Sequence, residues 1–567
     1  MRVLGLSCYY HDAAACLVEG ARVVAACQEE RFDRNKASAA FPIEAINACL
    51  QQADVTMDDV DMVAFYEKPF LKLERMLISH LRSWPRSLRT FLETVPPWLQ
   101  DRLIVPLTVE RELGFKGPVH FCSHHQSHAA SAFLASPFDE AAVLTADGIG
   151  EWATTTFGRG RGTELELLGE LRYPDSLGLL YSAVTAWLGY RALRGEGKVM
   201  ALADFGEPAY LDLLHKGVPV ADDGSIRVDP RFLSVVEGDR MVGPAFLEAF
   251  GDPREPGSEL TDHHRNVAAS LQRYLEQVMI RMARHLHAQV GSPNLCLAGG
   301  VCLNISATSR VMEDSPFEQV FIQPAAGDAG GALGAALLVA HAGGETERGP
   351  AMTSAALGPE YTAPRMRRAA SRHRGEVRTL DEEDLLREVT RQLQANRVVG
   401  WYQGRMEFGP RALGQRSILA NPCHPPMKDI LNERVKHREP FRPYGVSVLA
   451  ERADEFFHLD RPSPFMLQVA NVRDEVRDRI PAALHVNGTS RLQTVTEEDN
   501  GIYYRLIRAF ADATGVPMVI NTSFNDNNEP IVCTPEDAYA CFAATGMDTL
   551  VMGSLLLEKE PLGGDRD

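Results

Sequence analysis

The amino-acid sequence predicts an α/β protein with two domains. The chain has 567 residues, more than one hydrophobic core usually supports. Short apolar runs typical of strands alternate with stretches of helical periodicity in both halves. Glycine, proline and arginine concentrate in residues 346–380. We therefore expect a linker at 346–380 between a domain of residues 1–345 and a domain of residues 381–567.

The first domain alternates strands and helices along its length. Small apolar residues predict strands at 2–6, 15–18, 21–27, 62–65, 118–121, 142–144 and 295–297. Helical spacing of apolar residues predicts helices at 43–52, 124–135, 179–190, 265–290 and 330–342. The second domain repeats this alternation, with helices expected at 382–396 and 498–514 and strands at 398–402, 446–449 and 517–520.

Residues 66–115 stand out as a helical insertion. Leucine and phenylalanine recur at helical spacing among several arginines, and prolines 85, 96 and 97 are expected to break the segment into pieces. Three roles are open for it. It is a helical insertion packed on the domain, a cover over an acceptor site, or a membrane-associated element.

The overall composition indicates a soluble cytoplasmic protein. The formal net charge is −18, which argues against nucleic acid or an anionic membrane as a general partner, although a local basic pocket remains compatible with it. The N-terminus has no basic leader, and the longest apolar run, around 332–340, is too short to span a bilayer. The ten cysteines include no C-x-x-C pair, so free buried thiols are expected.

Four residues suggest a metal site. His124 and His128 are four positions apart, so a helix would present both imidazoles on one face. Asp147 follows the expected strand 142–144 and precedes a glycine turn, and Asp328 lies in the glycine-rich segment 324–331, so each would present a carboxylate at a strand end. Two imidazoles and two carboxylates suit a divalent ion such as iron, manganese or zinc. The alternative is a polar helix face beside two ordinary turns.

Glycine turns and basic residues suggest phosphate contacts. Gly299, Gly300 and Asn304 lie in one turn and Gly327 in another, where backbone N–H groups can meet phosphate or ribose. Each turn could equally be structural. In the second domain, glycine-, proline- and hydroxyl-rich turns contain basic and amide residues that suit an anion pocket rather than scattered surface ion pairs: Arg411, Lys436, Arg442, Arg491 and Asn521.

Ten motifs occur together in the order found in one known family. They are His11-Asp12, EERF at 29–32, HHQSHA at 124–129, DGIGE at 147–151, GEGKVM at 195–200, GGVCLN at 299–304, GDAGGA at 327–332, EFGPRALG at 407–414, GTSR at 488–491 and NTSFN at 521–525. The chain resembles the carbamoyltransferases of nodulation-factor and antibiotic biosynthesis, which include an O-carbamoyltransferase that tailors tobramycin. The resemblance covers nearly the whole chain.

The resemblance implies a fold and a reaction. The first domain is similar to the tRNA threonylcarbamoyl-transfer protein of the actin-like ATPase superfamily, and the second resembles the threonylcarbamoyl-adenylate synthase (YrdC-like) fold. The family uses ATP and carbamoyl phosphate as co-substrates, forms carbamoyl-adenylate in the second domain, and transfers the carbamoyl group to a hydroxyl in the first domain with the help of a divalent metal, reported as iron(II).

The resemblance also implies residue roles. The expected metal ligands are His124, His128, Asp147 and Asp328, and His11 matches the base suspected to act on the acceptor hydroxyl. The carbamoyl-phosphate pocket matches Arg411, Arg442, Arg491 and Asn521. Nucleotide or phosphate contacts fall at Lys36, Lys436 and Ser523.

The acceptor is expected to be a hydroxylated small molecule. The short approach to His11, residues 7–10, argues against an aminoglycoside, and insertion 66–115 favours a larger or more apolar acceptor. A homodimer is compatible with the sequence. Two alternative functions are a threonylcarbamoyl-type tRNA-modifying enzyme and a non-enzymatic actin-like nucleotide-binding regulator. The acidic charge disfavours the first, and the complete metal and arginine sets disfavour the second.

Overall fold

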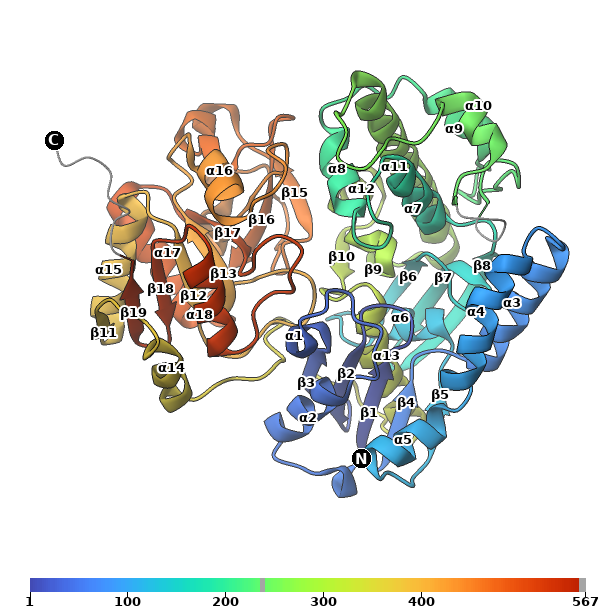
Figure 1. Cartoon of the computed structure of the whole chain (residues 1–567), viewed down its shortest axis with the longest axis horizontal. Coiled ribbons are helices and arrows are strands. Elements are labelled where there is room, and N and C mark those ends of the chain that lie inside the picture. The colour runs from blue at the N-terminus through green and yellow to red at the C-terminus, as the bar shows by residue number, and fades with distance from the viewer. Residues whose placement is uncertain (235–239, 560–567) are drawn as a thin grey trace. The chain divides into compact units, whose positions relative to one another are not determined.

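The protein is a mixed α/β structure of two compact units (Figure 1). This computed structural model describes residues 1–234 and 240–559, without the side chains of residues 97, 100 and 101. The first unit contains Met1–Glu29 and Ala37–Met352. The second contains Glu30–Lys36 and everything from Thr353 onward. The predicted α/β class is confirmed, and the short segment Glu30–Lys36 belongs to the second unit although its neighbours in sequence belong to the first.

The first unit begins with a five-stranded sheet in the order β3-β2-β1-β4-β5. β1, β2 and β3 form an antiparallel meander, while β4 pairs parallel with β1 and β5 pairs parallel with β4. The strands are β1 (Arg2–Ser7), β2 (Ala14–Glu19), β3 (Arg22–Gln28), β4 (Met62–Phe65) and β5 (Val119–Phe121).

A second five-stranded sheet repeats this topology. β6, β7 and β8 form the antiparallel meander, β9 is parallel to β6, and β10 is parallel to β9. The strands are β6 (Glu140–Ala146), β7 (Ala153–Arg161), β8 (Glu164–Arg172), β9 (Asn294–Ala298) and β10 (Gln319–Ile322). The two sheets of the first unit therefore have the same strand topology. The repetition is one of strand order and pairing.

Two helices pack tightly between the repeated halves. α6 (His124–Phe133) contacts α13 (Asp328–Ala342), and α13 also contacts β1 and β2. Glycines permit this approach. A Cβ at Gly5 would lie 1.9 Å from the carbonyl oxygen of Ala332, and a Cβ at Gly334 would lie 1.8 Å from that of Ser127. The start of α6 and the start of α13 are thereby brought together.

The other helices of the first unit surround the sheets. They are α2 (Ile43–Gln52), α7 (Leu177–Trp187), α8 (Glu196–Ala203), α9 (Leu211–Gly217), α10 (Pro244–Phe250), α11 (Asp262–Val290) and α12 (Ile305–Asp314). Within the described part of the chain, every helix is too short or too polar to cross a bilayer.

The predicted insertion is present and consists of α3 (Pro69–Arg82), α4 (Leu88–Asp101) and α5 (Val105–Leu113). Pro85 separates α3 from α4 as expected. Pro96 and Pro97, however, lie inside α4, so the prediction that they break the segment was wrong. α4 continues past both prolines while packed against α3, because tertiary contact supports a helix that has lost two N–H donors.

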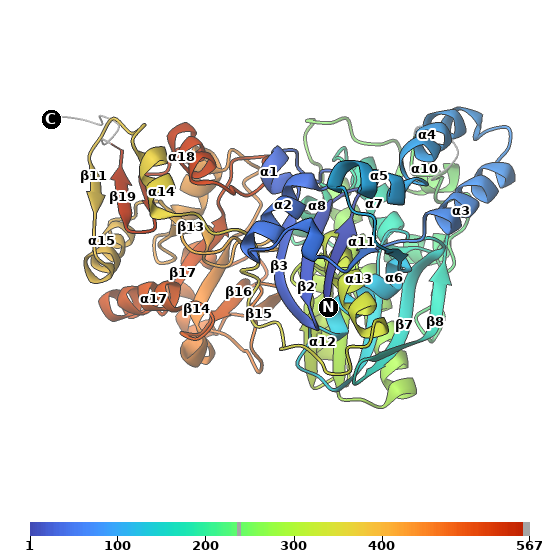
Figure 2. The ribbon, with the colours of Figure 1, turned by 90° about the horizontal axis from the view of Figure 1, so that it is seen from below.

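The second unit has a nine-stranded sheet in the order β11-β19-β18-β12-β13-β17-β14-β16-β15. Figure 2 shows α14 and α18 on one side of it and α15 and α17 on the other, and the two members of each pair are in contact. The strands are β11 (Val377–Thr379), β12 (Val399–Tyr402), β13 (Arg416–Ala420), β14 (Gly445–Leu449), β15 (Gln468–Asn471), β16 (Thr489–Val495), β17 (Met518–Ser523), β18 (Thr549–Met552) and β19 (Leu555–Glu558). The helices are α14 (Ala363–Ala370), α15 (Glu382–Gln394), α16 (Met427–Ile430), α17 (Gly501–Thr514) and α18 (Pro535–Ala544).

Most of the predicted linker is structured. Residues 346–380 contain α14 and β11, and β11 pairs with β19 at the edge of the second sheet. Three of the seven arginines of this stretch lie in α14, which has a proline in its first turn and buries Met366. Arginine-rich and proline-rich sequence here marks an amphipathic surface helix rather than a flexible connection.

The segment Glu30–Lys36 is fastened to the second unit by arginines. It contains the short helix α1 (Glu30–Asp33). Arg31 donates to the carbonyl oxygen of Gly409 at 2.5 Å, and Arg34 donates to that of Ile531 at 2.7 Å. These bonds place Lys36 in the same unit as the basic residues with which it was predicted to act.

Candidate functional site

Four predicted metal ligands converge in the first unit. His124 Nε2 lies 3.0 Å from Asp147 Oδ2 and 3.1 Å from His128 Nε2. His128 Nε2 lies 3.6 Å from Asp328 Oδ1. One ligand atom from each residue lies within 4.8 Å of the others, and all four residues are buried. The pattern predicted from helix spacing and two isolated aspartates is thus one compact donor set.

Local structure explains how each ligand is placed. α6 begins at His124, so residues 124 and 128 lie one turn apart on one face. Asp147 follows β6, and its Oδ1 accepts the backbone N–H of Gly300 at 2.9 Å. Gly299 has a φ of 95°, and a Cβ there would lie 2.2 Å from the carbonyl oxygen of Ala146. The glycine turn therefore packs against the end of β6 and orients Asp147.

The electrostatics of this cluster fit a cation. Both carboxylate oxygens of Asp328 are buried, and neither accepts a hydrogen bond from the residues that the structure describes. Burial alone would raise the pKa of Asp328, but His11, His124 and His128 lower it to about 2. Burial would likewise lower the pKa of His128, yet Asp147 and Asp328 raise it to about 9. Ionised carboxylates this deeply buried require positive charge, which a divalent ion bound by the imidazoles and carboxylates would provide.

His11 lies beside the cluster in the turn between β1 and β2. Its Nδ1 is 2.8 Å from Asp12 Oδ2, and its Nε2 is 3.9 Å from Asp328 Oδ2. Burial would lower the pKa of His11, but Asp328 and the hydrogen bond to Asp12 raise it to about 10. The predicted base is therefore next to the metal ligands, and the same carboxylates set its charge.

Sequence reasoning missed Glu151, which supports the cluster. Its Oε1 accepts the backbone N–H of His124 at 3.0 Å and that of Lys68 at 2.8 Å. Arg75 of α3 donates to the carbonyl oxygen of Gly150 at 2.8 Å. Lys68 and Arg75, at the start of the helical insertion, are thus hydrogen-bonded to the loop that follows Asp147. Glu151 is the last residue of the DGIGE motif, so the motif carried the signal without indicating the role.

Two of the residues predicted to contact nucleotide in the first unit, Gly300 and Asn304, make hydrogen bonds within the protein. The Gly300 N–H is donated to Asp147. Asn304 caps α12 by accepting the Ala307 N–H, and it exchanges hydrogen bonds with Gln272. Gly327 precedes α13, and the nearest atom to a Cβ there would be 3.9 Å away, on Leu303. Gly327 therefore has open space beside it that could admit a ligand, whereas Gly300 and Asn304 bond to neighbouring parts of the protein.

In the second unit, strand register places two predicted anion-site residues, Arg491 and Asn521, in one row on either side of Gly445. Gly445 of β14 is paired with Arg491 of β16 and with Asn521 of β17. Directly paired residues share a face of the sheet, so the Arg491 and Asn521 side chains lie on the same face. A Cβ at Gly445 would lie 2.8 Å from Arg491 Nε. Glycine in the middle strand therefore leaves the space that the arginine occupies.

Arginines cluster around this row. Burial and the nearby charges of Arg411, Arg438 and Arg442 lower the pKa of Arg491 well below its ordinary value. Burial lowers the pKa of Arg411 to about 10, and burial together with Arg438 lowers that of Arg442 to about 10. Arginines that repel one another in a buried setting favour an anion between them.

Arg438 belongs to this cluster although the sequence analysis did not single it out. Its Nε donates to Asn432 Oδ1 at 2.9 Å, and its guanidinium lies 4.3 Å from the centre of the Tyr444 ring. The available signal was its position four residues before Arg442, in a proline-rich turn.

The remaining predicted phosphate contacts also come together. Lys436 Nζ donates to the Ser523 carbonyl oxygen at 2.9 Å and to Asn525 Oδ1 at 2.5 Å. Burial and the charges of Arg438, Arg442 and Lys36 hold the pKa of Lys436 well below its ordinary value. Lys36, Lys436 and Ser523 therefore form one neighbourhood, which is coupled to the arginine cluster.

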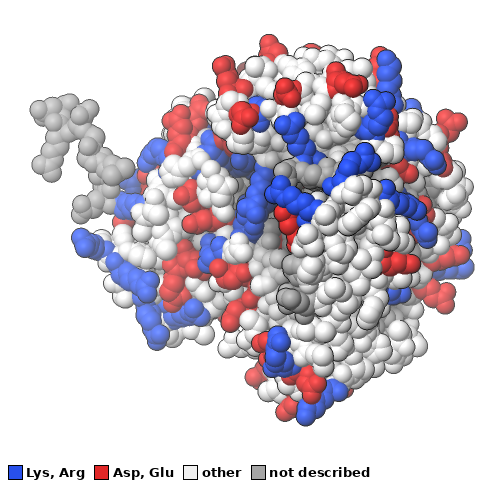
Figure 3. Space-filling model, turned by 45° about the vertical axis from the view of Figure 1, so that its right-hand side comes forward, with Lys and Arg blue, Asp and Glu red and all other residues white. Residues whose placement is uncertain are grey.

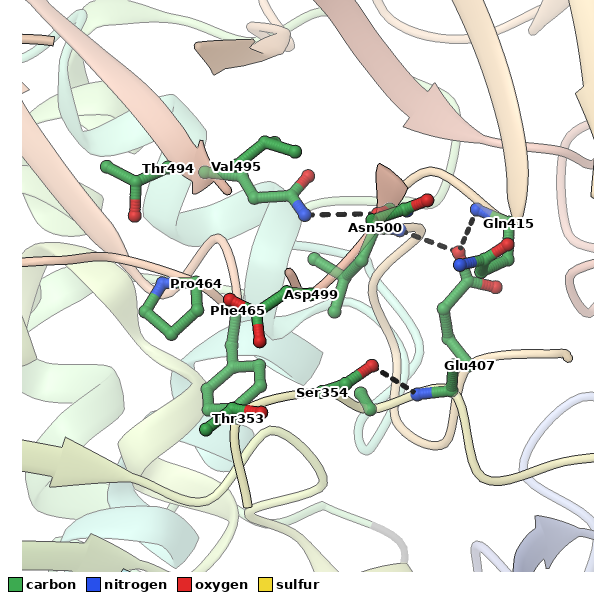
Figure 4. A pocket seen from close by; sticks show the side chains of 14 residues that line it. Thr353, Ser354, Glu407, Gln415, Pro464, Phe465, Thr494, Val495, Asp499 and Asn500 are labelled. Carbon is green, nitrogen blue, oxygen red and sulfur yellow. Dashed lines mark hydrogen bonds between the residues drawn. The ribbon is translucent and has the colours of Figure 1, made fainter. Parts of the chain in front are cut away.

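A small cavity of about 30 Å³ borders the loop that carries Arg411 (Figure 4). Its lining includes Glu407, whose Oε1 accepts the backbone N–H groups of Leu413, Gln415 and Arg416. Gln493, also in the lining, donates to the Leu413 carbonyl oxygen at 3.0 Å. Glu407 and Gln493 thus hold the loop whose first part presents Arg411 and Ala412.

Comparison with known proteins identifies relatives along the whole chain. An uncharacterised protein of Synechocystis sp. is 44% identical, with 98% of this chain and 96% of the relative covered. The nodulation protein NolNO of Sinorhizobium fredii is 38% identical, with 97% and 79% covered. Among solved structures, component A of the (R)-2-hydroxyglutaryl-CoA dehydratase of Acidaminococcus fermentans is similar at a TM-score of 0.31 and 13% identity, covering 59% of this chain and 96% of that one.

Family models match both units. The model described as "Carbamoyltransferase N-terminus" matches residues 2–337, and the model described as "Carbamoyltransferase C-terminus" matches residues 390–559. Together they cover most of the chain, including the His–Asp cluster and the arginine cluster. This protein therefore belongs to the carbamoyltransferase family.

Proposed function

We propose that this carbamoyltransferase is an ATP-dependent O-carbamoyltransferase with two half-reactions. In the first, carbamoyl phosphate, ATP and water give carbamoyl-adenylate, pyrophosphate and phosphate. In the second, an acceptor hydroxyl displaces AMP and becomes a carbamate ester. The second unit performs activation and the first performs transfer. The acceptor is a hydroxylated small molecule.

The arginine cluster of the second unit carries the proposal. Arg411, Arg442 and Arg491, joined by Arg438, make a concentrated positive site in a chain whose net charge is −18. Guanidinium groups bind phosphate through paired N–H donors, and Asn521 adds a neutral polar group in the same row. The Oδ1 of Asn521 is buried and has no hydrogen-bond partner among the described residues, so it can accept from the amide of a carbamoyl group. Lys436, Lys36 and Ser523 extend the site toward a triphosphate.

The His–Asp cluster of the first unit supports transfer. A divalent ion bound by His124, His128, Asp147 and Asp328 would polarise the carbamoyl carbonyl or the acceptor hydroxyl. Iron(II) is our proposal for that ion, because mixed imidazole and carboxylate ligands suit it. His11 Nε2 lies 3.9 Å from Asp328 Oδ2. A divalent ion bound by Asp328 would offset the negative charge that raises the pKa of His11, so the neutral imidazole could take the proton of the hydroxyl as the new C–O bond forms.

Separate assays of the two half-reactions test this function. The purified protein should release pyrophosphate from ATP only when carbamoyl phosphate is present. Arg442→Ala should abolish that release. His124→Ala should leave it largely intact while abolishing carbamate formation on any accepted hydroxyl. Pyrophosphate release that does not need carbamoyl phosphate would contradict the proposed activation step, and equal loss of both activities in a folded His124 variant would contradict the division between units.

A further inference from the structure

The helical insertion has an inverted distribution of polarity. α3 buries Lys72, Arg75 and His80, while Phe70 and Leu81 are more than two-thirds exposed, at 71% and 72%. Lys72 Nζ forms a buried ion pair with Glu67 at 2.5 Å, so the polar face is satisfied inside the protein. A surface helix normally turns its apolar side to the core. The opposite arrangement here leaves an apolar face without an intramolecular partner among the described residues.

The exposed apolar residues form continuous stripes. On α3, positions 70, 77 and 81 lie on one side, and on α4 positions 88, 92 and 99 do the same. Trp84, 55% exposed, lies between the two helices at the tip of the hairpin. From residue 70 to residue 81 the α3 stripe is about 16 Å long. Contiguous exposed apolar surface of this kind marks an interaction site.

The charge around the stripes identifies the partner. Residues 69–101 contain five basic and three acidic residues, a local positive balance in a chain whose net charge is −18. Arg82, Arg86 and Arg89 are exposed beside the apolar positions. One of the exposed arginines, Arg89, pairs with Glu93 at 2.9 Å. Figure 3 brings the side that carries α3 and α4 forward and shows a broad uncharged area with basic side chains along its upper edge and acidic side chains at other parts of its edge. Leucine, tryptophan and arginine in this arrangement are typical of helices that lie in the interface of an anionic bilayer.

We propose that the α3–α4 hairpin, residues 69–101, docks the protein on an anionic lipid surface. The apolar stripes enter the headgroup region, and the arginines contact lipid phosphate. A second copy of the chain fits less well because two such hairpins would bring like charges together. A small-molecule acceptor fits less well because the stripes are exposed on helices rather than gathered in a cavity. This inference is independent of the proposed transfer chemistry.

Vesicle co-sedimentation of the full-length protein tests the proposal. The wild type should bind vesicles of phosphatidylcholine mixed with phosphatidylglycerol, bind pure phosphatidylcholine much less, and dissociate as salt rises. The triple variant Leu81→Ser/Trp84→Ser/Leu88→Ser should bind the anionic vesicles at least about tenfold more weakly. The pair Leu167→Ser/Leu168→Ser on β8, also exposed, is the matched control and should bind like the wild type.

Two results would overturn the docking proposal. One is wild-type binding that is equal for anionic and neutral vesicles or absent from both. The other is a wild-type dimer in sedimentation velocity that the triple variant converts to monomer, which would assign the hairpin to self-association. Carbamoyl-phosphate-dependent pyrophosphate release should be unchanged in the triple variant. That readout shows that the variant is folded and separates the docking proposal from the proposed catalytic function.

Discussion

Glu151 accepts the backbone N–H of His124 at the N-terminus of α6, the helix that carries both histidines of the proposed metal site. The same carboxylate accepts the Lys68 N–H at the start of the helical insertion. A single buried side chain therefore connects the proposed metal ligands with the helical insertion. Support of this kind determines how precisely a ligand set is held.

Removal of Glu151 should weaken metal binding without removing a ligand. In Glu151→Ala, two backbone N–H groups lose their acceptor, which we expect to cost about 1–3 kcal/mol of unfolding free energy. Affinity for the divalent ion should fall about 10–100-fold. Metal content after dialysis and thermal unfolding measure the two effects. Glu166→Gln, an exposed carboxylate on β8, is the control, and equal losses in both variants would remove the assigned role.

Asp328 should determine whether the ion is held at all. Asp328→Asn removes one negative ligand and leaves the other three in place. The amount of divalent ion bound should therefore fall below one per chain. Isothermal titration of the metal-free protein with iron(II) or manganese(II) measures this directly. A variant that binds metal as tightly as the wild type would show that Asp328 is not a ligand.

Gly445→Ala should disturb carbamoyl-phosphate binding through Arg491. The added Cβ would lie 2.8 Å from Arg491 Nε and 3.0 Å from Met466 Sδ, so the guanidinium must move although no charge changes. We expect the KM for carbamoyl phosphate in the pyrophosphate assay to rise at least about tenfold, as for the loss of one charge-assisted hydrogen bond. Gly169→Ala on β8, where the nearest atom is 3.8 Å away, should change nothing. An unchanged KM in Gly445→Ala would mean that Arg491 does not contact this substrate.

Arg438 should be needed for substrate affinity in the second unit. Arg438→Gln removes one charge from the arginine cluster and keeps a donor near Asn432 Oδ1. We expect weaker binding of carbamoyl phosphate, and we expect the loss to shrink as salt concentration rises, because the missing contribution is electrostatic. The exposed Arg508→Gln serves as the comparison. A salt-independent loss would instead indicate disrupted packing against Tyr444.

His485 makes the stability of the second unit depend on pH. Burial lowers the pKa of His485 to about 4 in the folded protein, from an ordinary value of 6.5. Between these values the unfolded chain binds a proton that the folded chain does not, so stability falls as pH drops from 6.5 toward 4. Denaturant unfolding at pH 7 and pH 5 should show this loss, and His485→Asn should reduce it. Variant His458→Asn, an exposed histidine, should keep the wild-type dependence.

The extent to which the site could be predicted depends on how local its determinants are. His124 and His128 were predictable because helix geometry alone places residues four apart on one face. Asp147 and Asp328 were predicted as candidates. Asp328 approaches the histidines because α13 packs closely on α6, where Gly334 lies against the Ser127 carbonyl oxygen, and no local sequence pattern reveals this contact.

The roles of other residues could not be predicted from the sequence, because the same chemical group can bind a ligand or a neighbouring part of the protein. The Gly300 N–H was predicted to meet phosphate, whereas it binds Asp147. Arg438 was not singled out from the sequence, because only the fold brings its charge close enough to act on Arg491. The duplicated topology of the first unit was invisible for a similar reason, because it is defined by which strands pair and not by residues they share.

The assignment of Glu30–Lys36 to the second unit has a consequence for biosynthesis. Arg31 and its partner Gly409 are 378 positions apart, so this segment leaves the ribosome long before the sheet that receives it exists. The second unit therefore completes its folding only after nearly the whole polypeptide has been translated. A gene split near residue 353 would deliver a carboxy-terminal product that lacks Arg31, Arg34 and Lys36, and its activity should return only when the amino-terminal product is co-expressed.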